Sequence, residues 1–228
     1  MPMFPLGAVL FPTMVMPLHV FEPRYRRLMA DCMAGDRRFG VTLIERGSEV
    51  GGGDVRSPTG TVARIAEARQ LDDGRWALVA VGTERIRVQE WLPDDPYPRA
   101  GVEAWPDSEP ESGPDSTVGG RYAQRYTHLR RLLALATEMG IAGAPSTLDL
   151  SDDPSVGSWQ LAASAPLGQF DRQRLLAAPT VDERLDLLGE LLDEADLIRR
   201  GRLEPETDGG PQDGGADEDD SRDTPGPA

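Results

Sequence analysis

The sequence contains no lysine: all 24 basic residues are arginine, against 39 acidic residues, and the formal net charge is −15 over 228 residues. A phosphate-binding loop of the G-x-x-x-x-G-K-S/T type needs a lysine, and so do a Schiff-base amine and a Ser-Lys hydrolytic dyad. The absence of lysine excludes all three kinds of chemistry from this chain. We therefore predict that the protein is not an enzyme.

Cysteine and histidine are nearly as scarce, with Cys32 as the single cysteine and His19 and His128 as the two histidines. One cysteine cannot form an internal disulfide, which is typical of a reducing compartment, and we expect a cytoplasmic protein. These residues do not form a pair at the short spacing that zinc sites use, so we predict neither a metal nor another cofactor. Cys32 falls on the apolar face of a predicted helix, where a thiol is neutral and inert, and we predict no catalytic residue.

Negative charge is concentrated at the C-terminal end, where residues 202–228 carry nine acids and two arginines. This segment has almost no apolar residue to bury, and we expect a disordered acidic tail. The rest of the chain is acidic as well, so it offers no basic field for nucleic-acid phosphates or anionic membrane surfaces. We expect neither nucleic acid nor membrane as a partner.

Apolar periodicity changes once along the chain. Over residues 1–106, short alternating stretches separated by turn residues predict strands, with one early helix over 23–34. Residues 107–120 are rich in Pro, Gly, Ser and acids and are predicted to be a linker. Over residues 121–201 the apolar residues recur at helical spacing. The expected fold is therefore α+β, a pseudo β-barrel with one early helix followed by a C-terminal helical bundle.

The individual elements are predicted from the same patterns. The predicted strands are Met3–Leu6, Ala8–Phe11, Met14–Val20, Phe39–Ile44, Thr61–Leu71, Trp76–Val81, Arg85–Leu92 and Arg99–Trp105. The predicted helices of the bundle are a long one that includes Tyr122–Ala136, two short ones over Val156–Ala165 and Gln169–Ala177, and a last one after Pro179. Residues 47–60 are predicted to be a flexible loop because of their Gly, Ser and Pro content.

Several short motifs occur in a fixed order. They are Phe4-Pro5-Leu6, Phe11-Pro12, Leu18-His19-Val20-Phe21-Glu22-Pro23-Arg24-Tyr25, Phe39-Gly40, Gly60-Thr61-Val62-Ala63-Arg64-Ile65, Asp73-Gly74-Arg75 and Val81-Gly82-Thr83-Glu84-Arg85. In this order they resemble the N-terminal substrate-binding domain of ATP-dependent Lon proteases, over roughly residues 1–200. The resemblance implies a PUA-like pseudo-barrel followed by helices, and a role in recognising polypeptides for an ATPase-protease.

On this resemblance we expect a non-catalytic polypeptide-binding protein, a stand-alone family member without ATPase and peptidase domains that serves as a protein quality-control adaptor. Its expected partners are unfolded or partly folded polypeptides and a separate ATPase-protease. The alternative is a PUA-like module that binds RNA or a small molecule, and the acidic body argues against RNA. A third class, a hydrolase built on Cys32 or on carboxylates, is disfavoured by the scarcity of cysteine and histidine.

The candidate peptide-binding residues are Met14, Met16, Arg24, Tyr25, Arg85 and Trp91. Methionine-rich surfaces adapt to varied partners, although Met14 and Met16 equally suit core packing. Arg85 and Trp91 are predicted to lie on the polar face of their strand. The expected binding surface is either the groove between barrel and bundle or an exposed barrel edge that accepts an extended chain.

The corner between the strand over 14–20 and the helix over 23–34 receives its own prediction. Phe21 is expected to be buried and to anchor the turn, which implies a cost of about 3–5 kcal/mol for Phe21→Ala. Tyr25 is expected to begin the apolar face of the helix. Glu22 is expected to meet the free N–H groups at the start of the helix, with Arg24 or Arg85 as its ionic partner.

Overall fold

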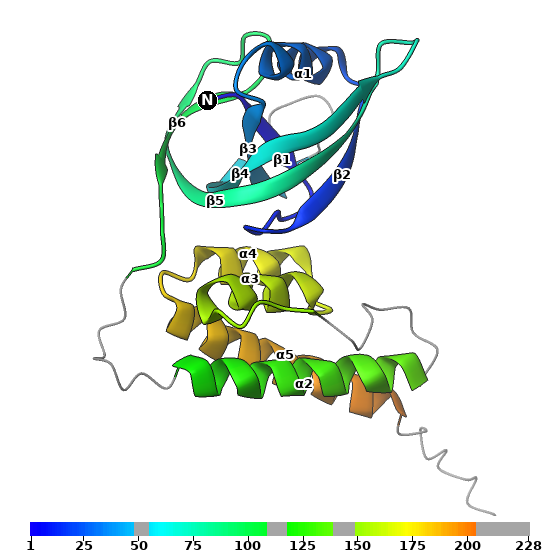
Figure 1. The fold of residues 1–228 in the computed structure, drawn as a ribbon, viewed down its shortest axis with the longest axis vertical. Coiled ribbons are helices and arrows are strands. Elements are labelled where there is room, and N and C mark those ends of the chain that lie inside the picture. The colour runs from blue at the N-terminus through cyan, green and yellow to red at the C-terminus, as the bar shows by residue number, and fades with distance from the viewer. Residues whose placement is uncertain (48–54, 109–117, 139–148, 204–228) are drawn as a thin grey trace, which may run out of the picture.

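The computed structural model describes residues 1–47, 55–108, 118–138 and 149–203. Within these ranges the chain forms six strands and five helices, arranged as a β-barrel subdomain on one side and a helical subdomain on the other (Figure 1). This confirms the expected α+β class. The tail from residue 204, residues 109–117 of the predicted linker and residues 48–54 of the predicted loop lie outside the described residues.

The strands are β1 (Met3–Leu6), β2 (Val15–Val20), β3 (Arg38–Arg46), β4 (Val55–Gln70), β5 (Trp76–Leu92) and β6 (Arg99–Ala104). The helices are α1 (Pro23–Ala34), α2 (Val118–Glu138), α3 (Pro154–Ser164), α4 (Gln169–Ala177) and α5 (Val181–Leu203). The predicted bounds of β1, α1 and α4 are confirmed to the residue.

Three predictions of secondary structure are wrong. Residues 8–11 form no strand, because Val9 and Phe11 are buried in the core of the helical subdomain instead of pairing with a neighbour. The two stretches predicted on either side of residues 82–84 are one continuous strand, β5, which curves around the barrel. Residues 55–60 belong to β4 rather than to a loop, since β3 supplies their hydrogen-bonding partner despite their polar composition.

The strand path runs β1-β3-β4-β5-β2, and β6 also pairs with β5. The β1–β3 pair is parallel and the other pairs are antiparallel. β2 pairs with the first part of β5 and β6 with the last part. The barrel closes between β1 and β6, where the Met3 N–H donates to the Pro98 carbonyl at 2.8 Å and the Ala100 N–H donates to the Met1 carbonyl at 3.1 Å. β2 is left at one end of the strand path.

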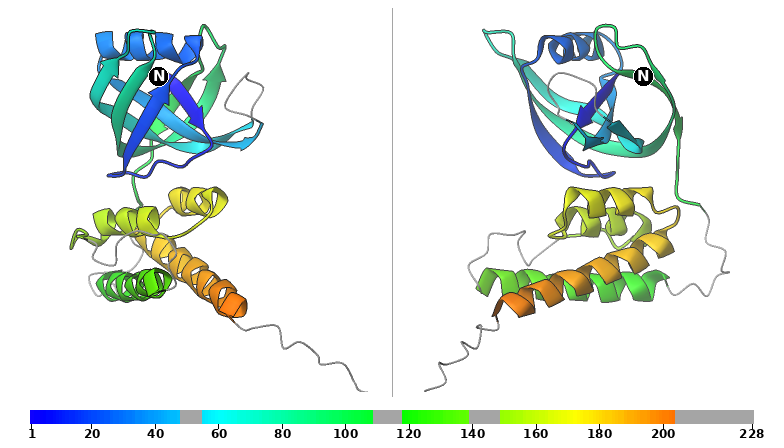
Figure 2. Two further views of the ribbon diagram at one scale, coloured as in Figure 1. Left: turned by 90° about the vertical axis from the view of Figure 1, so that its right-hand side faces the viewer. Right: turned by 180° about the vertical axis from the view of Figure 1, so that it is seen from behind.

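Two large apolar cores hold the molecule together, and barrel residues contribute to both. The barrel core is covered at one end by α1, whose Tyr25 ring lies against Phe4 with 4.3 Å between ring centroids. The helical core also contains Val9, Phe11 and Leu43 from the barrel. Figure 2 shows α3 and α4 as the helices nearest to the barrel, with α2 and α5 beyond them. The two subdomains are therefore packed together, not merely tethered.

Candidate functional site

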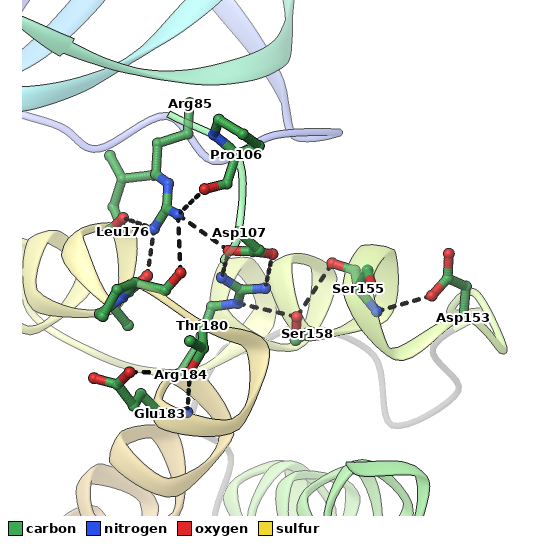
Figure 3. A network of polar contacts seen from close by, with 12 residues as sticks. Arg85, Pro106, Asp107, Asp153, Ser155, Ser158, Leu176, Thr180, Glu183 and Arg184 are labelled. Atoms are coloured by element: carbon green, nitrogen blue, oxygen red, sulfur yellow. Dashed lines mark hydrogen bonds and ion pairs between the residues drawn. The ribbon is translucent and has the colours of Figure 1, made fainter. Parts of the chain in front are cut away.

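Arg85 lies in the interface between barrel and helices, not on an exposed face of β5, and only 4% of it is accessible. Its guanidinium donates to carbonyls at the C-terminal end of α4, at 3.0 Å to Leu176 (Figure 3) and also to Ala178. A further N–H of the guanidinium donates to the Trp105 carbonyl at 2.8 Å. It also donates to the Asp107 carboxylate at 3.1 Å. Its hydrogen-bonding groups are thus engaged inside the protein, and none is offered to a client.

Arg184 of α5 completes this network and is fully buried. It donates to both carboxylate oxygens of Asp107, at 2.8 and 2.7 Å, and its guanidinium lies 3.4 Å from the centroid of the Trp159 ring. Burial lowers the pKa of Arg85 to about 10; the Asp107 carboxylate opposes this shift, whereas the neighbouring guanidinium of Arg184 adds to it. The buried network of Arg85, Asp107 and Arg184 therefore joins the two subdomains.

The expected groove between barrel and helices is largely filled by this network. Beside the network lies a hollow of about 260 Å³. It is lined by Pro12, Thr83, Glu84, Arg85, Ala104, Trp105, Pro106, Asp107 and Trp159. Ligand pockets are commonly larger, roughly 300–1,000 Å³. The groove is therefore the weaker of the two surfaces expected from the sequence.

The other candidate residues do not converge on one place. Met16 and Tyr25 are buried in the barrel core, and Met14 is half-buried between the two cores. Arg24 pairs with Glu22 at 3.1 Å and its guanidinium lies 4.5 Å from the centroid of the Tyr25 ring. Met14, Met16 and Tyr25 therefore pack in the cores, and Arg24 contacts Glu22 and Tyr25 at the corner.

Trp91 is half-buried at the far end of β5. It packs against a small third core that contains Met3 and Ile86, and the Arg56 guanidinium lies 4.6 Å from its ring centroid. Trp91 therefore belongs to a different face of the barrel from the strand-to-helix corner.

At that corner the prediction for Phe21 is wrong, because its side chain is 58% exposed. Side chains alternate along β2, and Met16 and Val20 point into the core. Phe21 continues the opposite, outward set, while Tyr25 fills the buried position at the corner. Period-two alternation from Met16 was the signal in the sequence that could have placed Phe21 outside.

The expected cap at the start of α1 is also absent from the structure. Glu22 occupies the N-cap position, but its side chain makes no capping hydrogen bond and instead accepts one from Arg24 at 3.1 Å. Pro23 at the first helical position has no N–H to satisfy, which reduces the need for a cap. Of the two ionic partners expected for Glu22, the structure shows Arg24 and not Arg85.

The outward side chains of β2 and its neighbour β5 form a partly apolar face. Val15 and Phe21, at the two ends of this stretch, are each 58% exposed. Between them lie Pro17 and His19, which face Val79 and Ala77 of β5 across the ladder. We define the β2 surface as Val15, Pro17, His19, Phe21, Ala77 and Val79.

A shallow hollow of about 390 Å³ lies on these strands. Its lining includes Pro17, His19, Ala77 and Val79 of the β2 surface, with the charged side chains of Glu67 and Arg69 from β4 beside them. An apolar patch with a polar rim is typical of a surface that binds another molecule. No sequence motif marked this surface, because it combines two strands far apart in the chain.

Cys32 is buried in the barrel core, and its thiol donates to the Arg38 carbonyl at 3.3 Å. Burial raises the pKa of this thiol to about 12, and the nearby carboxylates of Asp36 and Asp31 add to the increase. A thiol in this state is not a nucleophile at neutral pH. In the described part of the chain, no group of three or more His, Cys, Asp or Glu side chains could hold a metal ion. Among the described helices none is both long and apolar enough to span a bilayer.

The family model described as the ATP-dependent protease La (LON) substrate-binding domain matches residues 1–194. The chain belongs to this family. The resemblance seen in the sequence motifs is thereby confirmed.

Curated relatives and solved structures agree with this assignment. Lon protease 2 of Herpetosiphon aurantiacus is 29% identical over 85% of this chain and 24% of its own length, and Lon protease 2 of Myxococcus xanthus is 28% identical over 84% and 23%. The chain thus spans about a quarter of the length of these relatives.

Among solved structures, a Lon N-terminal domain protein from Xanthomonas campestris is 32% identical over 82% of this chain and 95% of its own, with a TM-score of 0.59. The N-terminal domain of Mycobacterium avium complex Lon protease shares the fold, with a TM-score of 0.62 at 18% identity over 85% of this chain and 97% of its own.

Proposed function

We propose that this protein is a non-catalytic polypeptide-binding protein and that the β2 surface is its binding site. The observation that carries the proposal is the exposure of Val15 and Phe21, 58% each, at the two ends of the outward-facing side chains of β2, in a member of a substrate-binding-domain family. Removing exposed aromatic and branched apolar side chains from water is favourable, so a partner that covers them gains binding free energy. Unfolded polypeptides present such apolar side chains, whereas folded proteins bury most of theirs.

A non-catalytic role is supported by the chemistry of the chain. It has no lysine for a phosphate-binding loop or a Ser-Lys dyad, and its single thiol is buried with a pKa of about 12. The β2 surface offers one histidine, His19, with no cysteine, serine or carboxylate of its own. Such a surface can hold a chain but has no nucleophile to cleave it.

The biological setting follows from the family. We propose that the protein presents unfolded clients to a separate ATPase-protease as an adaptor, in the cytoplasm, because the matched relatives are Lon proteases. We also propose that residues 1–106 and 121–201, connected by the linker over 107–120, act as one binding unit. The buried Arg85–Asp107–Arg184 network between them supports this view.

RNA is the weaker alternative. The chain carries a net charge of −15, and two of its arginines, Arg85 and Arg184, are buried in the subdomain interface. Others, including Arg38, Arg75 and Arg121, are paired with acidic side chains. A backbone of phosphates needs a basic track, and this chain is acidic overall.

The test uses reduced, carboxymethylated α-lactalbumin, a permanently unfolded protein, labelled for fluorescence anisotropy. Phe21→Ser should raise the Kd of the complex between the protein and this unfolded chain about tenfold, the effect of losing about 1.4 kcal/mol of binding free energy. Phe170→Ser is the matched control, because Phe170 is 66% exposed but lies on α4 in the helical subdomain. Equal effects of the two substitutions, or no binding by the unmodified protein, would contradict the proposal.

A further inference from the structure

The direction of each backbone group in β2 can be derived from its pairing with β5. The Gly82 N–H donates to the Met14 carbonyl at 2.9 Å, just before β2 begins. In an antiparallel ladder, residue pairs that exchange hydrogen bonds alternate with pairs that do not. The register places Met16 opposite Ala80, one step of two residues further along. Met16 and the even-numbered residues after it therefore bond to β5, and the odd-numbered residues point their N–H and C=O groups away from it.

The pairing of β5 with β4, on its other side, shows independently which residues of β5 bond to β2. At the β4–β5 turn the Leu71 N–H donates to the Arg75 carbonyl at 2.8 Å. Two residues further along, Arg69 pairs with Ala77, so Ala77 bonds toward β4. The N–H and C=O groups of the odd-numbered residues in this part of β5 are thus hydrogen-bonded to β4. Only the even-numbered ones remain for β2, as the first derivation requires.

The outer edge of β2 consequently carries a row of backbone groups without a strand partner. They are the N–H and C=O of Val15, the C=O of Pro17, and the N–H and C=O of His19. In the strand path of the described residues β2 is terminal, and within this part of the chain these groups make no backbone hydrogen bond to another segment. Alternate residues of a strand are about 7 Å apart, and an extended peptide has its own groups at this spacing.

Pro17 indicates which extended chain fits this edge. If two copies of the protein paired their β2 strands symmetrically about Pro17, the two prolines would face each other and neither could donate a hydrogen bond. Proline at an edge strand is a known safeguard against such pairing. A client residue opposite Pro17 can still donate its own N–H to the Pro17 carbonyl. The edge therefore disfavours a second copy and remains open to another polypeptide.

We infer that a client polypeptide binds by adding a strand to the outer edge of β2, with its backbone hydrogen-bonded to Val15, Pro17 and His19. Its side chains on the solvent face would lie beside Val15 and His19 as cross-strand neighbours, which accounts for the exposed apolar side chains there. Recognition of this kind depends on the extended backbone more than on sequence, as a binder of varied unfolded chains needs. The inference rests on the proposed function and specifies its mode of binding.

Amide hydrogen exchange, followed by NMR on the full chain, tests the backbone contacts directly. In the free protein the amide hydrogens of Val15 and His19 should exchange fast, and those of Met16 and Leu18 slowly. Saturation with carboxymethylated α-lactalbumin should slow exchange at Val15 and His19 at least about tenfold and leave Met16 and Leu18 unchanged. Binding that leaves the Val15 and His19 amides as fast as before would overturn the inference while the proposed function stands.

A second experiment changes the client backbone. The probe is a labelled ten-residue peptide of alternating valine and threonine, flanked by arginines for solubility. A scan of single backbone N-methylations should weaken binding about tenfold at every second position and less than about twofold at the positions between. Attraction between the arginines and the acidic protein is equal for all these peptides, so it cancels in the comparison. Uniform sensitivity along the peptide would refute strand addition, and no binding of either probe would overturn both the inference and the proposed function.

Discussion

Arg184 donates two parallel hydrogen bonds to the carboxylate of Asp107, 2.8 and 2.7 Å long. The same carboxylate accepts a further bond from Arg85 at 3.1 Å (Figure 3). Asp107 lies just after β6, Arg85 on β5 and Arg184 on α5, so one acid connects the barrel, the segment leaving it and the last helix. Two buried cations depend on this single negative charge.

Removal of the charge should therefore be costly. Asp107→Asn should lower the free energy of unfolding by about 3–5 kcal/mol, because it leaves two buried guanidinium groups without a counter-charge. Asp94→Asn is the control, since Asp94 pairs with Arg56 at 3.4 Å near the surface and is 41% exposed. That substitution should cost less than about 1 kcal/mol. Urea denaturation followed by circular dichroism measures both, and equal losses would show that the buried network contributes nothing special.

The corner between β2 and α1 yields a second prediction, which reverses what the motif alone suggested. Phe21→Ala should change stability by about 0.5 kcal/mol or less, because the side chain is largely exposed. Tyr25→Ala should cost about 3–5 kcal/mol, because it removes a buried ring that packs against Phe4. Denaturant melts of the two variants decide the matter. A Phe21→Ala protein that is less stable than Tyr25→Ala would contradict the observed arrangement.

Cys32 gives a prediction for pH. Its thiol has a pKa of about 12 in the folded protein, whereas the pKa of a thiol in the unfolded chain is about 8.5. Between these values the unfolded state has lost a proton that the folded state retains, so the free energy of unfolding falls as pH rises through this window. Below about pH 8 the contribution should be constant.

Tyr97 and Tyr122 also have raised pKa values because of burial, so the cysteine contribution must be isolated. Urea melts between pH 7 and about 10 should show a shallower decline for Cys32→Ala than for the unmodified protein, by up to about 1.4 kcal/mol per pH unit. A thiol reagent should modify Cys32 only in denaturant. Identical pH slopes for the two proteins would count against the raised pKa.

Elements bounded by strong local signals were predictable from the sequence. Pro23 at the first helical position and Gly35 after the last residue define α1, and the predicted bounds are confirmed. The outward position of Phe21 was available in principle from the alternation of β2. It was missed because a corner motif suggested an anchoring aromatic, and a local pattern of this kind does not say which side chain the core accepts.

Long-range contacts explain what could not be predicted. Arg85 belongs to the polar face that the alternation of its strand predicts to be exposed. Its guanidinium is nevertheless buried, because it donates to the carbonyls of Leu176 and Ala178, more than 90 residues later in the chain. Nothing in the neighbourhood of Arg85 in the sequence encodes these partners. The β2 surface has the same character, because Val79 and Ala77 meet Pro17 and His19 only through the register of distant strands.

The last prediction compares two glycines at which an added side chain would meet different obstacles, backbone at Gly82 and a flexible side chain at Gly189. A Cβ atom at Gly82 would lie 2.1 Å from the Phe11 carbonyl oxygen, where the loop before β2 crosses β5. At Gly189 of α5 the added atom would lie 2.2 Å from the guanidinium carbon of Arg125. The first obstacle is backbone, held in place because the Gly82 N–H donates to Met14 and its carbonyl accepts from the Thr13 N–H. The second is the far end of a flexible side chain.

Gly82→Ala should therefore lower the free energy of unfolding by about 1–3 kcal/mol or more, the usual cost of overpacking. Gly189→Ala should stay within about 1 kcal/mol of the unmodified protein. The Arg125 side chain can swing aside at the cost of its 3.0 Å hydrogen bond to the Leu185 carbonyl, and alanine is about 1 kcal/mol better than glycine inside a helix. Urea melts of both variants measure the difference directly. If Gly189→Ala were the more damaging change, the close contact of the loop with β5 at Gly82 would not be the constraint that the structure indicates.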